Sequence, residues 1–340
     1  MPIYDRSLLR KSFTITDDNI YCVHMMADFT YLEGRPVHYY RGREILKAHP
    51  EIKELMGTNA WTALWTLALV ATQVIASGFA ENLAWYWIIV LAYLFGAFLN
   101  HALYVVIHEC THNLVFKNSQ SNNLLGIFCD FALAVPSAMG FRKYHLMHHK
   151  FLGQYLRDPD IVRHEEARLI SNSPLRKALW LFLFSVSQAF RPMQIVETEF
   201  WDRWIISNLV TVFTVDFLIF FFIGPSALAY LALSTLFALG LHPLGGRWIQ
   251  EHYLTEEGQE TYSYYGPLNK TCFNMGYHNE HHDFATVPWN NLPTVRRLAP
   301  EYYDNLKFYQ SWIAVLLHYI LSPNMSSYSR IVRPAVTAKE

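Results

Sequence analysis

Four long apolar stretches constrain how this chain of 340 residues folds more than any other feature. Residues 61–79, 84–107 and 226–244 contain no Asp, Glu, Lys or Arg, and residues 204–223 contain a single acid, Asp216. Each stretch is long enough to cross a hydrocarbon layer about 30 Å thick as one helix. Because 52% of the residues are hydrophobic and only 16% are charged, the sequence predicts an all-α integral membrane protein.

The four stretches form two pairs with short breaks, which predicts two transmembrane helical hairpins and four spans. The first break covers residues 80–83, and the second is Gly224-Pro225, a strong turn signal. No Lys or Arg lies in residues 61–107 or 204–246, although the chain has 27 of them. Since basic residues favour the cytoplasmic side, we expect both hairpin turns to face away from the cytoplasm and both termini to be cytosolic.

Two weaker apolar stretches, residues 124–139 and 179–190, are expected to lie along the membrane surface as helices of a cytosolic cap. The first contains Asp130 and Pro136, and the second is too short to span comfortably. If both crossed the membrane instead, the protein would have six spans. We therefore expect a single domain, residues 1–340, made of an N-terminal cytosolic segment (1–56), a first hairpin (61–107), a cap with interfacial helices (108–203), a second hairpin (204–244) and a final cap and tail (245–340).

Eight of the sixteen histidines are concentrated in three short clusters. The clusters are His108-Glu-Cys-Thr-His112, His145-Leu-Met-His148-His149 and His278-Asn-Glu-His281-His282. On a helix, residues three and four apart share a face, so each cluster presents its imidazoles in one direction. All three clusters lie in segments expected to be cytosolic. Together they supply more ligands than one ion needs and enough for two, and imidazole suits iron, zinc or copper.

Further polar residues accompany the clusters. We expect His252, just after the fourth apolar stretch, to be a ninth metal ligand, and His242 to contact the substrate, support a ligand or cap a helix end. Asn274 is another candidate for such an outer contact. Acids beside the clusters can orient the imidazoles through the second ring nitrogen. These acids are Glu109, Asp158, Asp160, Glu280 and Asp283.

Three polar side chains, Asn100, His101 and Asp216, interrupt the apolar stretches. Polar groups at membrane depth are costly and are often functional. Asn100 and His101 are therefore candidates for contacts around the metal site or with the substrate, and a hydrogen bond between helices is the alternative. Asp216 has the same two interpretations, and for it helix packing or a pocket is favoured over metal ligation.

Composition excludes some functions and leaves others open. The net charge is −1, and no block of basic residues indicates nucleic-acid binding. The four cysteines include no CxxC pair, which favours reduced thiols over a disulfide framework. On the histidines alone, a metal-dependent oxidoreductase, a zinc-dependent membrane lipid hydrolase and a metal-dependent membrane receptor or scaffold all remain open.

The three histidine clusters, in this order and with this hairpin spacing, resemble those of the membrane fatty-acyl desaturase and hydroxylase superfamily. Other segments narrow the resemblance to the sphingolipid Δ4-desaturase (dihydroceramide desaturase) family, over residues 28–330. The segments that carry it include Asp158-Pro-Asp160, Gly240-Leu-His-Pro243, Glu260-Thr-Tyr-Ser-Tyr-Tyr-Gly-Pro-Leu-Asn269 and Gly276-Tyr-His-Asn-Glu-His-His-Asp-Phe284.

The resemblance implies a multi-pass enzyme of the endoplasmic reticulum membrane with a cytosolic active site. It implies two iron ions, molecular oxygen, and electrons from NADH through cytochrome b5 reductase and cytochrome b5, with zinc as a substitute in purified protein. The implied reaction converts dihydroceramide into ceramide by a trans double bond between C4 and C5 of the sphingoid chain. A sphingolipid C4-hydroxylase, or an enzyme with both activities, is the alternative on the same scaffold.

Two departures from the family pattern matter. The chain carries twenty-five or more residues before the region of resemblance, expected to be either a genuine extension or an upstream start. In stearoyl-type relatives, an Asn four residues before the histidine that corresponds to His252 helps to complete the metal site, and here that position is Trp248. The group that completes the coordination of one metal therefore stays open, and a water can take that place.

Overall fold

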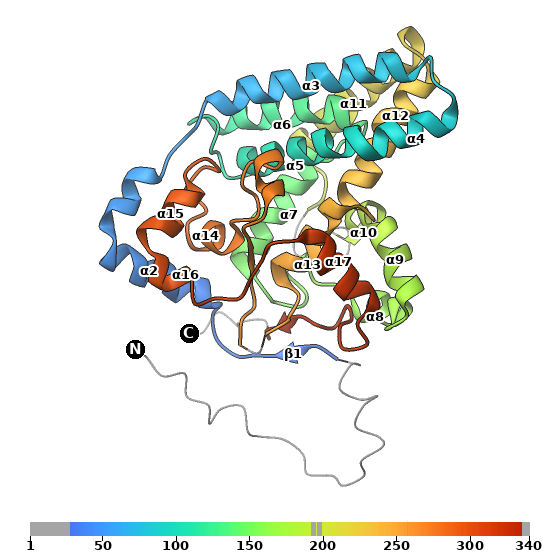
Figure 1. Ribbon diagram of the computed structural model, residues 1–340. Coiled ribbons are helices and arrows are strands. Elements are labelled where there is room, and N and C mark those ends of the chain that lie inside the picture. The colour runs from blue at the N-terminus through green and yellow to red at the C-terminus, as the bar shows by residue number, and fades with distance from the viewer. Residues whose placement is uncertain (1–27, 192–194, 196–198, 257, 335–340) are drawn as a thin grey trace.

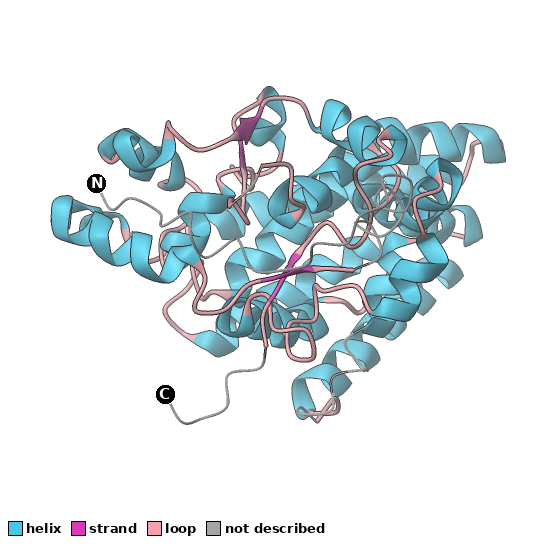
Figure 2. Ribbon diagram, turned by 90° about the horizontal axis from the view of Figure 1, so that it is seen from below, coloured by secondary structure: helices cyan, strands magenta, loops and turns pink. Residues whose placement is uncertain are grey.

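The structure of the chain is a computed structural model that describes residues 28–191, 195, 199–256 and 258–334 (Figure 1). The expected N-terminal extension, residues 1–25, lies outside the described residues. Helices account for almost all the regular structure of the described part, and the strands are short (Figure 2). The strands form two parallel pairs, β1 with β4 and β2 with β3, which join segments far apart in the chain.

The elements divide into a layer of long apolar helices and a cap of shorter helices (Figure 1). The elements up to the second hairpin are β1 (Thr30–Tyr31), α2 (Val37–Ala48), η2 (Pro50–Leu55), α3 (Trp61–Ala80), α4 (Trp85–Leu91), the π-helical η3 (Ala92–Gly96), α5 (Ala97–Thr111), α6 (Ser119–Leu133), α7 (Ala138–Phe151), α8 (His164–Ile170), α9 (Pro174–Phe182) and α10 (Phe184–Phe190). The later elements are α11 (Arg203–Phe222), α12 (Pro225–Leu239), η5 (Pro243–Gly245), α13 (Gly246–His252), β2 (Ser263–Tyr264), η6 (Pro267–Thr271), α14 (His278–Asp283), α15 (Leu292–Leu298), α16 (Pro300–Tyr303), β3 (Phe308–Tyr309), α17 (Trp312–Leu321) and β4 (Ile331–Val332).

Within the described ranges, three helices are long and apolar enough to cross a membrane. They are Trp61–Ala80 (α3), Trp85–Thr111 (α4, η3 and α5 in succession) and Arg203–Phe222 (α11). Two pairs, α6 with α7 and α12 with the helices that follow it, qualify only if each bent pair is one span. The count is therefore three to five by length and composition, and the expectation of a helical protein with membrane-type spans is confirmed.

The two hairpin turns meet at one end of the helix layer (Figure 1). The carboxylate of Glu81, in the first turn, accepts hydrogen bonds from the backbone N–H groups of Ser226 (2.8 Å) and Ala227 (3.1 Å). The first N–H groups of a helix have no partner within the helix, and a negative charge is favourable at that end. A helix rises 1.5 Å per residue, so His108 lies about 35 Å along the helix that begins at Trp85. Glu81 thus joins the two hairpins at the end opposite the histidines.

The fourth apolar stretch differs from the single straight span that its composition suggests. Helix α12 ends just before Gly240, and the chain bends by 41° before α13. At Gly240, a side chain would approach the carbonyl oxygen of Leu236 to 2.5 Å, so only glycine fits there. His242 then starts a 3-10 turn by accepting a hydrogen bond from the N–H of Leu244 at 3.2 Å. The bend directs α13, which ends in His252, into the cap.

The first of the two weaker apolar stretches forms parts of α6 and α7, which meet at 119°. Ala134 ends α6 in the left-handed conformation, with φ of 53°. Asp130 holds the corner by accepting hydrogen bonds from Ser137 Oγ and from the N–H of Ala138. Asn208 of α11 donates a third hydrogen bond to Asp130. Helix α6 therefore packs along α3 and α5, and α7 turns away to carry the second histidine cluster into the cap (Figure 1).

The second weaker stretch forms α9 and α10, which leave large apolar side chains exposed. Leu175 and Leu179 of α9 are 78% and 55% exposed, and Phe190 of α10 is 60% exposed. Helices that bury one face and expose apolar residues on the other suit a membrane surface. The buried faces pack against α17 and α12, which connects this part of the cap to the helix layer.

Candidate metal centre

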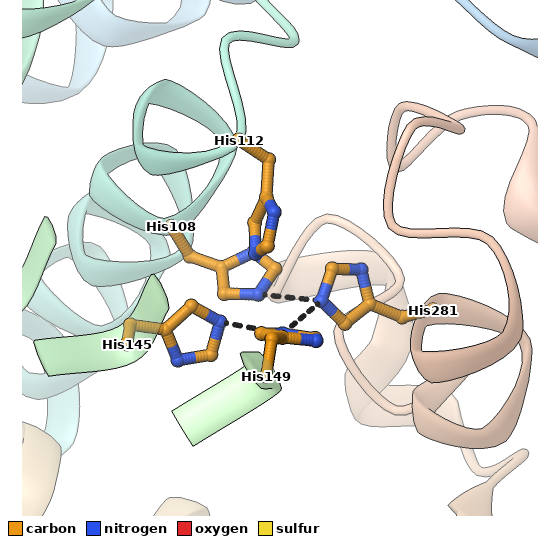
Figure 3. Close-up of side chains that lie close together, drawn as sticks. All are labelled: His108, His112, His145, His149 and His281. Carbon is orange, nitrogen blue, oxygen red and sulfur yellow. Dashed lines mark hydrogen bonds between the residues drawn. The ribbon is translucent and has the colours of Figure 1, made fainter. Parts of the chain in front are cut away.

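Five histidines from three parts of the chain converge on one point between α5, α7 and α14, and we call them the five-histidine group (Figure 3). They are His108 and His112 at the end of α5, His145 and His149 of α7, and His281 of α14. One nitrogen of each lies within 4.8 Å of the others. Nε2 of His281 is 3.0 Å from Nε2 of His108 and 3.1 Å from Nε2 of His149. Nε2 of His145 is 3.0 Å from that of His149, so four Nε2 atoms face one another.

Four further histidines form a second group beside the first, which we call the four-histidine group. His148 of α7, His252 of α13 and His282 of α14 each place one nitrogen within 4.8 Å of the others. His278 completes the group, because its Nε2 lies 3.1 Å from Nε2 of His252. The rings of His149 and His282 stack with centroids 4.4 Å apart and connect the two groups. All nine histidines that the sequence suggested as ligands therefore lie in these two adjacent groups.

A carboxylate supports the ring of His148 directly. Oδ1 of Asp158 lies 2.9 Å from Nδ1 of His148, and its other oxygen accepts a hydrogen bond from the N–H of Gly153. Oδ2 of Asp160 is 3.5 Å from the same nitrogen. Since a carboxylate only accepts, Nδ1 of His148 carries a proton, and Nε2 is the ring atom that can bind a cation.

Two glutamates lie behind other rings at a greater distance. Oε1 of Glu109 is 3.7 Å from Nδ1 of His108, and its second oxygen accepts a hydrogen bond from the N–H of Trp289. Oε1 of Glu251 is likewise 3.7 Å from Nδ1 of His278. These separations exceed a hydrogen bond, and a polar gap of this size is where a bridging water fits.

Helix α14, which carries the third cluster, is held in place by α2. Asp283 lies 2.8 Å from Nδ1 of His38 and accepts hydrogen bonds from Nε of Arg41 (2.7 Å) and the hydroxyl of Tyr303 (3.0 Å). Arg41 also donates to Oδ1 of Asn279 at 3.1 Å. Burial alone raises the pKa of Asp283, but the charge of Arg41 and the His38 hydrogen bond bring that pKa below its ordinary value. The carboxylate therefore stays charged and fixes the end of α14.

Glu280 anchors the opposite side of α14. It accepts hydrogen bonds from Ser263 Oγ (2.7 Å) and the hydroxyl of Tyr265 (2.6 Å), and burial raises its pKa to about 6. The turn before the helix is tight, because a side chain at Gly276 would approach Oδ1 of Asn269 to 2.5 Å. Glu280 thus positions the helix without contacting an imidazole of either group.

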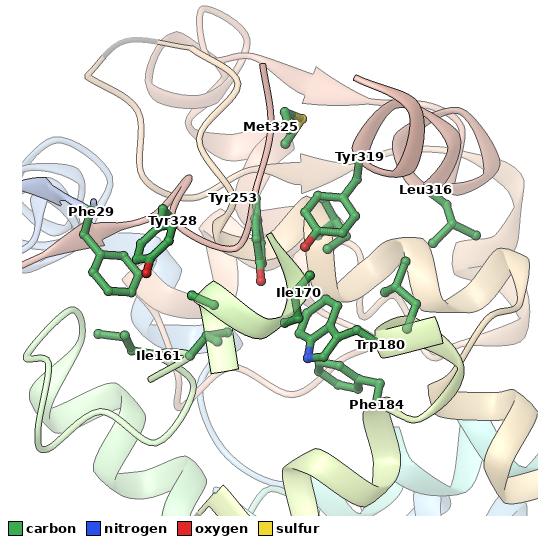
Figure 4. Close-up of a cluster of buried hydrophobic side chains, with 14 of the residues drawn as sticks. Phe29, Ile161, Ile170, Trp180, Phe184, Tyr253, Leu316, Tyr319, Met325 and Tyr328 are labelled. Carbon is green, nitrogen blue, oxygen red and sulfur yellow. The ribbon is translucent and has the colours of Figure 1, made fainter. Parts of the chain in front are cut away.

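Helix α13 is fixed by the apolar core of the cap (Figure 4). Ile249 and Tyr253, on either side of His252 in the sequence, are 1% and 2% exposed. The ring of Tyr253 lies 5.2 Å from that of Tyr319 on α17, and Tyr319 lies 6.0 Å from Trp180 on α9. Packing among these aromatic rings therefore sets the position of His252.

The histidines of α14 are held in the neutral form. Burial and the neighbouring imidazoles lower the pKa of His278, His281 and His282 well below their ordinary value. A neutral imidazole has one acceptor nitrogen, and this is the form that binds metal ions. Each Nε2 has either one proton or one lone pair, so the facing Nε2 atoms cannot all form hydrogen bonds with one another. A cation between them would bind the acceptor nitrogens. The donor set therefore fits a metal ion.

Asn100 belongs to a different polar cluster, inside the helix layer. Its amide nitrogen donates to Thr235 Oγ1 (2.9 Å) and to the carbonyl of Leu231 (3.4 Å), and its oxygen accepts a hydrogen bond from Gln73. Gln73 in turn accepts a hydrogen bond from the hydroxyl of Tyr230 at 2.7 Å. We call Gln73, Asn100, Tyr230 and Thr235 the membrane polar cluster. Every donor and acceptor of the Asn100 amide is hydrogen-bonded within the protein, so Asn100 forms hydrogen bonds between helices.

Neither His242 nor His101 lies in a histidine group. His242 uses both ring nitrogens, one accepting from the N–H of Leu244 and the other 3.1 Å from the carbonyl of Tyr93 in η3, so it caps the helix end. His101 uses Nδ1, which lies 3.0 Å from the carbonyl oxygen of Ala238. Its Nε2 is buried and has no hydrogen-bond partner in the described part of the chain.

Asp216 and Asn274 also lie outside the two groups. Asp216, on α11, is 8% exposed, and its Oδ1 has no hydrogen-bond partner among the residues described. Asn274 has a positive φ of 52° and donates to the carbonyl of Trp289 at 3.2 Å. Because the N–H of Trp289 binds Glu109, Asn274 reaches the five-histidine group only through intermediate residues.

Sequence reasoning identified Asp158 behind His148 and Glu109 behind His108, but it missed other residues that support the two groups. Glu251 had a signal, since it directly precedes His252 and shares α13 with it. Nothing in the sequence indicated His38 or Arg41, because α2 lies far from α14 in the chain and only the fold brings these two helices together.

Comparison with known protein families defines the class of the chain. Residues 83–313 match the family described as "Fatty acid desaturase", and residues 25–61 match the family described as "Sphingolipid Delta4-desaturase (DES)". The first match covers most of the chain and includes all nine histidines of the two groups. By class, the protein is a membrane-type desaturase.

Individual relatives narrow the class. "Sphingolipid delta(4)-desaturase DES1-like" of Oryza sativa subsp. japonica is 42% identical over 311 residues, which cover 92% of this chain and 94% of the rice protein. "Sphingolipid delta(4)-desaturase DES1" of Drosophila melanogaster and that of Homo sapiens are each 41% identical over 308 residues, covering 90% of this chain and 95% of each relative. The chain belongs to the sphingolipid Δ4-desaturase family of enzymes, which confirms the resemblance seen in its sequence.

Proposed function

We propose that this enzyme uses two iron ions and molecular oxygen to convert dihydroceramide into ceramide, by forming the trans C4=C5 double bond of the sphingoid chain. Electrons come from NADH through cytochrome b5 reductase and cytochrome b5. The observation that carries the proposal is the convergence of nine imidazoles in two adjacent groups, four of them with Nε2 atoms at contact distance. Membership of the sphingolipid Δ4-desaturase family supports the choice of substrate.

In this proposal each histidine group holds one ion. The ligands are His108, His112, His145, His149 and His281 for one ion and His148, His252, His278 and His282 for the other. Iron supplies the oxidising power that removes hydrogen from an unactivated methylene, which acid–base chemistry of side chains cannot do. Zinc can occupy the same nitrogen ligands in purified protein, but it has no redox chemistry.

The spacing of the facing nitrogens supports a cation between them. The separations are 3.0, 3.0 and 3.1 Å in the five-histidine group, and 3.1 Å between His252 and His278. Imidazole nitrogens that converge in this way suit iron or zinc.

Trp248 offers no ligand atom to the four-histidine group. Its indole N–H donates to the carbonyl of Leu239 at 3.0 Å, and its ring packs 5.0 Å from that of Phe184. An indole nitrogen is a donor only. In the proposal, this ion therefore keeps a coordination position that a water or another small ligand can fill.

The remaining contribution of the chain is orientation and the exclusion of water. Asp158 keeps the proton of His148 on Nδ1, and Asp283 holds α14 through His38 and Arg41. Such supporting contacts fix ring orientation and raise ligand basicity. His108, His148 and His281 are at most 2% exposed, so bulk water is kept from the place where hydrogen is removed.

The proposal includes a topology in the endoplasmic reticulum membrane. Residues 61–107 and 204–244 form two hairpins of two spans each, and the cytosolic segments 1–56, 108–203 and 245–340 complete a single domain that carries the metal centre. Support comes from the absence of Lys and Arg from both hairpins and from the contact between their turns at the end opposite the histidines.

The test is expression of the chain in cells that lack ceramide desaturation, with the sphingolipids identified by mass spectrometry. Appearance of the C4=C5 alkene, dependent on oxygen and on the electron donors, supports the proposal. Recovery of a 4-hydroxy product alone assigns the chain to sphingolipid C4-hydroxylases instead. Release of a fatty acid without oxygen or reductant indicates a zinc hydrolase and contradicts the proposal.

A further inference from the structure

Two polar side chains near the histidine groups have hydrogen-bonding atoms that the protein does not use. His101 of α5 is fully buried, and Arg247 of α13 is 3% exposed. Nδ1 of His101 lies 3.0 Å from the carbonyl oxygen of Ala238. A carbonyl only accepts, so Nδ1 carries the proton and Nε2 is an acceptor. That acceptor has no partner among the described residues.

Arg247 presents the complementary donors. Its Nε is 3.1 Å from Oε1 of Glu251, but neither atom has a partner with hydrogen-bond geometry in the described part of the chain. The guanidinium carbon lies 4.1 Å from the centroid of the Trp248 ring, over its face. A buried guanidinium without hydrogen bonds is costly. The Nε donor of Arg247 is therefore available to a bound molecule.

His101 of α5 and the start of α13, which carries Arg247, both pack beside Trp312 of α17. Gly246, which precedes Arg247, packs against the backbone of Trp312, where an added side chain would come within 2.2 Å of the carbonyl oxygen. The ring of His101 is 6.2 Å from the ring of the same Trp312. Oε1 of Glu251, which is 3.1 Å from Nε of Arg247, is also 3.7 Å from Nδ1 of His278 in the four-histidine group. The pair thus sits beside the centre where the chemistry is proposed.

We propose that His101 and Arg247 together bind a hydroxyl group of the sphingolipid substrate, next to the carbons that react. This proposal rests on the proposed function and deepens it. A hydroxyl both donates and accepts, so it can donate to Nε2 of His101 and accept from Arg247, whereas a carbonyl can only accept and a methylene can do neither.

The position of the pair agrees with the chemistry of the substrate. The C3 hydroxyl of a dihydroceramide is on the carbon next to C4, one of the two carbons that lose hydrogen. A site for this hydroxyl must therefore lie beside the metal centre, and Arg247 is connected to His278 of the four-histidine group through Glu251. The other polar candidates are excluded by their contacts, since Asn100 and His242 use all their hydrogen-bonding atoms within the protein.

The test compares two substrates in membranes that contain the full-length, metal-loaded enzyme. One is a dihydroceramide, and the other is its 3-deoxy analogue, which lacks only the C3 hydroxyl. His101→Phe and Arg247→Gln should each lower kcat/KM for the dihydroceramide about 10- to 100-fold, the range for a hydrogen bond to a charged or buried group. For the 3-deoxy analogue the same variants should match the wild type, and Arg43→Gln, at an exposed position on α2, should alter neither rate.

Equal losses on both lipids overturn the hydroxyl site, because a purely structural role or a bridging water affects both substrates alike, and they leave the proposed function standing. Turnover of neither lipid by the wild type overturns the proposed function and the hydroxyl site together. The iron content of each variant is measured alongside to separate loss of metal from loss of recognition. His101→Phe keeps the Arg247–Glu251 pair intact, so it carries the test if Arg247→Gln does not fold.

Discussion

Helix α5 contributes to two buried polar clusters that differ in how completely their atoms are paired. In the membrane polar cluster, every donor and acceptor of the Asn100 amide has a partner of complementary type. In the five-histidine group, which begins two turns later with His108, nitrogens of the same type face one another at 3.0–3.1 Å. Asn100 of the first cluster and His108 and His281 of the second are all buried, so burial of polar side chains does not by itself distinguish the two clusters.

This difference shows that the pairing of hydrogen-bond donors and acceptors can indicate a ligand site. A cluster whose donors and acceptors match is complete and connects helices. A cluster of acceptors that face each other is incomplete without a cation. The same reasoning separates His242, whose two ring nitrogens are both paired, from His101, which keeps one acceptor free. The predictions below test this distinction.

Loss of a histidine at the junction of three helices should have the largest effect. Nε2 of His281 faces both His108 and His149, so His281→Ala removes a proposed ligand that lies next to two other proposed ligands. We expect desaturation to fall by more than about 100-fold, because losing a ligand exceeds the 10- to 100-fold loss typical of a supporting residue. Lipid products and bound iron are measured in parallel with His318→Ala, which alters an exposed histidine of α17. Full activity in His281→Ala would remove this residue from the ligand set.

Removing the carboxylate behind His148 should have the next largest effect. Asp158→Asn keeps the shape of the side chain but removes the charge that holds the proton on Nδ1 of His148. We expect the affinity of the four-histidine group for its ion to fall about 10- to 100-fold. Metal titration of the solubilised protein measures this, with Asp304→Asn at an exposed site as the control. If both variants retain metal equally well, Asp158 has only a structural role.

Acid should destabilise the metal-free protein through its neutral histidines. The pKa values of His278, His281 and His282 are lowered by burial in the folded state, whereas the unfolded chain titrates near pH 6.5. Below that pH the unfolded chain takes up protons that the folded chain does not, so stability falls with decreasing pH. The loss approaches about 1.4 kcal/mol per pH unit for each such histidine.

The measurement is thermal unfolding of the metal-free protein at about pH 7.5 and about pH 5.5, on either side of the unfolded-state titration. The Tm should be lower at the acid pH, and His278→Gln should make the difference smaller. An equal Tm at both pH values would mean that these imidazoles are not held neutral, and the contrast between the two clusters would lose its electrostatic basis.

Disruption of the membrane polar cluster should reduce stability and leave the chemistry intact. Asn100→Leu removes hydrogen bonds to Gln73 and Thr235 without touching a histidine group. We expect a loss of about 1–2 kcal/mol in unfolding free energy, the usual range for hydrogen bonds between membrane helices. Activity per folded molecule should match that of Thr72→Val, an exposed substitution on α3. A selective loss of turnover in Asn100→Leu would instead assign Asn100 to the active site.

The gathering of the histidines could be predicted from spacing, but their division between two groups only in part. Pairs four residues apart share a helix face, so His145 with His149, and His278 with His282, enter the same group. His148 breaks the pattern by joining the other group. Which group such a residue joins depends on the angle at which α7 and α14 cross, and this angle cannot be predicted from the spacing of the histidines.

Asp158 and Asp283 could be predicted as supporting acids from their place beside the histidine clusters, but their partners on other elements could not. Arg41 and His38 reach Asp283 because α2 packs on α14, a pairing between segments at opposite ends of the chain. The membrane-type helices were predictable from apolar length, since burial in lipid requires long uncharged stretches. The bend at Gly240 was harder to foresee, because it depends on the close approach of Leu236 and not on composition.

Assembly from distant segments has a consequence for synthesis of the protein. One group draws its imidazoles from α5, α7 and α14, and the other from α7, α13 and α14. Neither set exists until the ribosome has translated the codon for His282 and α14 has docked on α2. A growing chain therefore offers no finished cation site until nearly all of the protein has been synthesised.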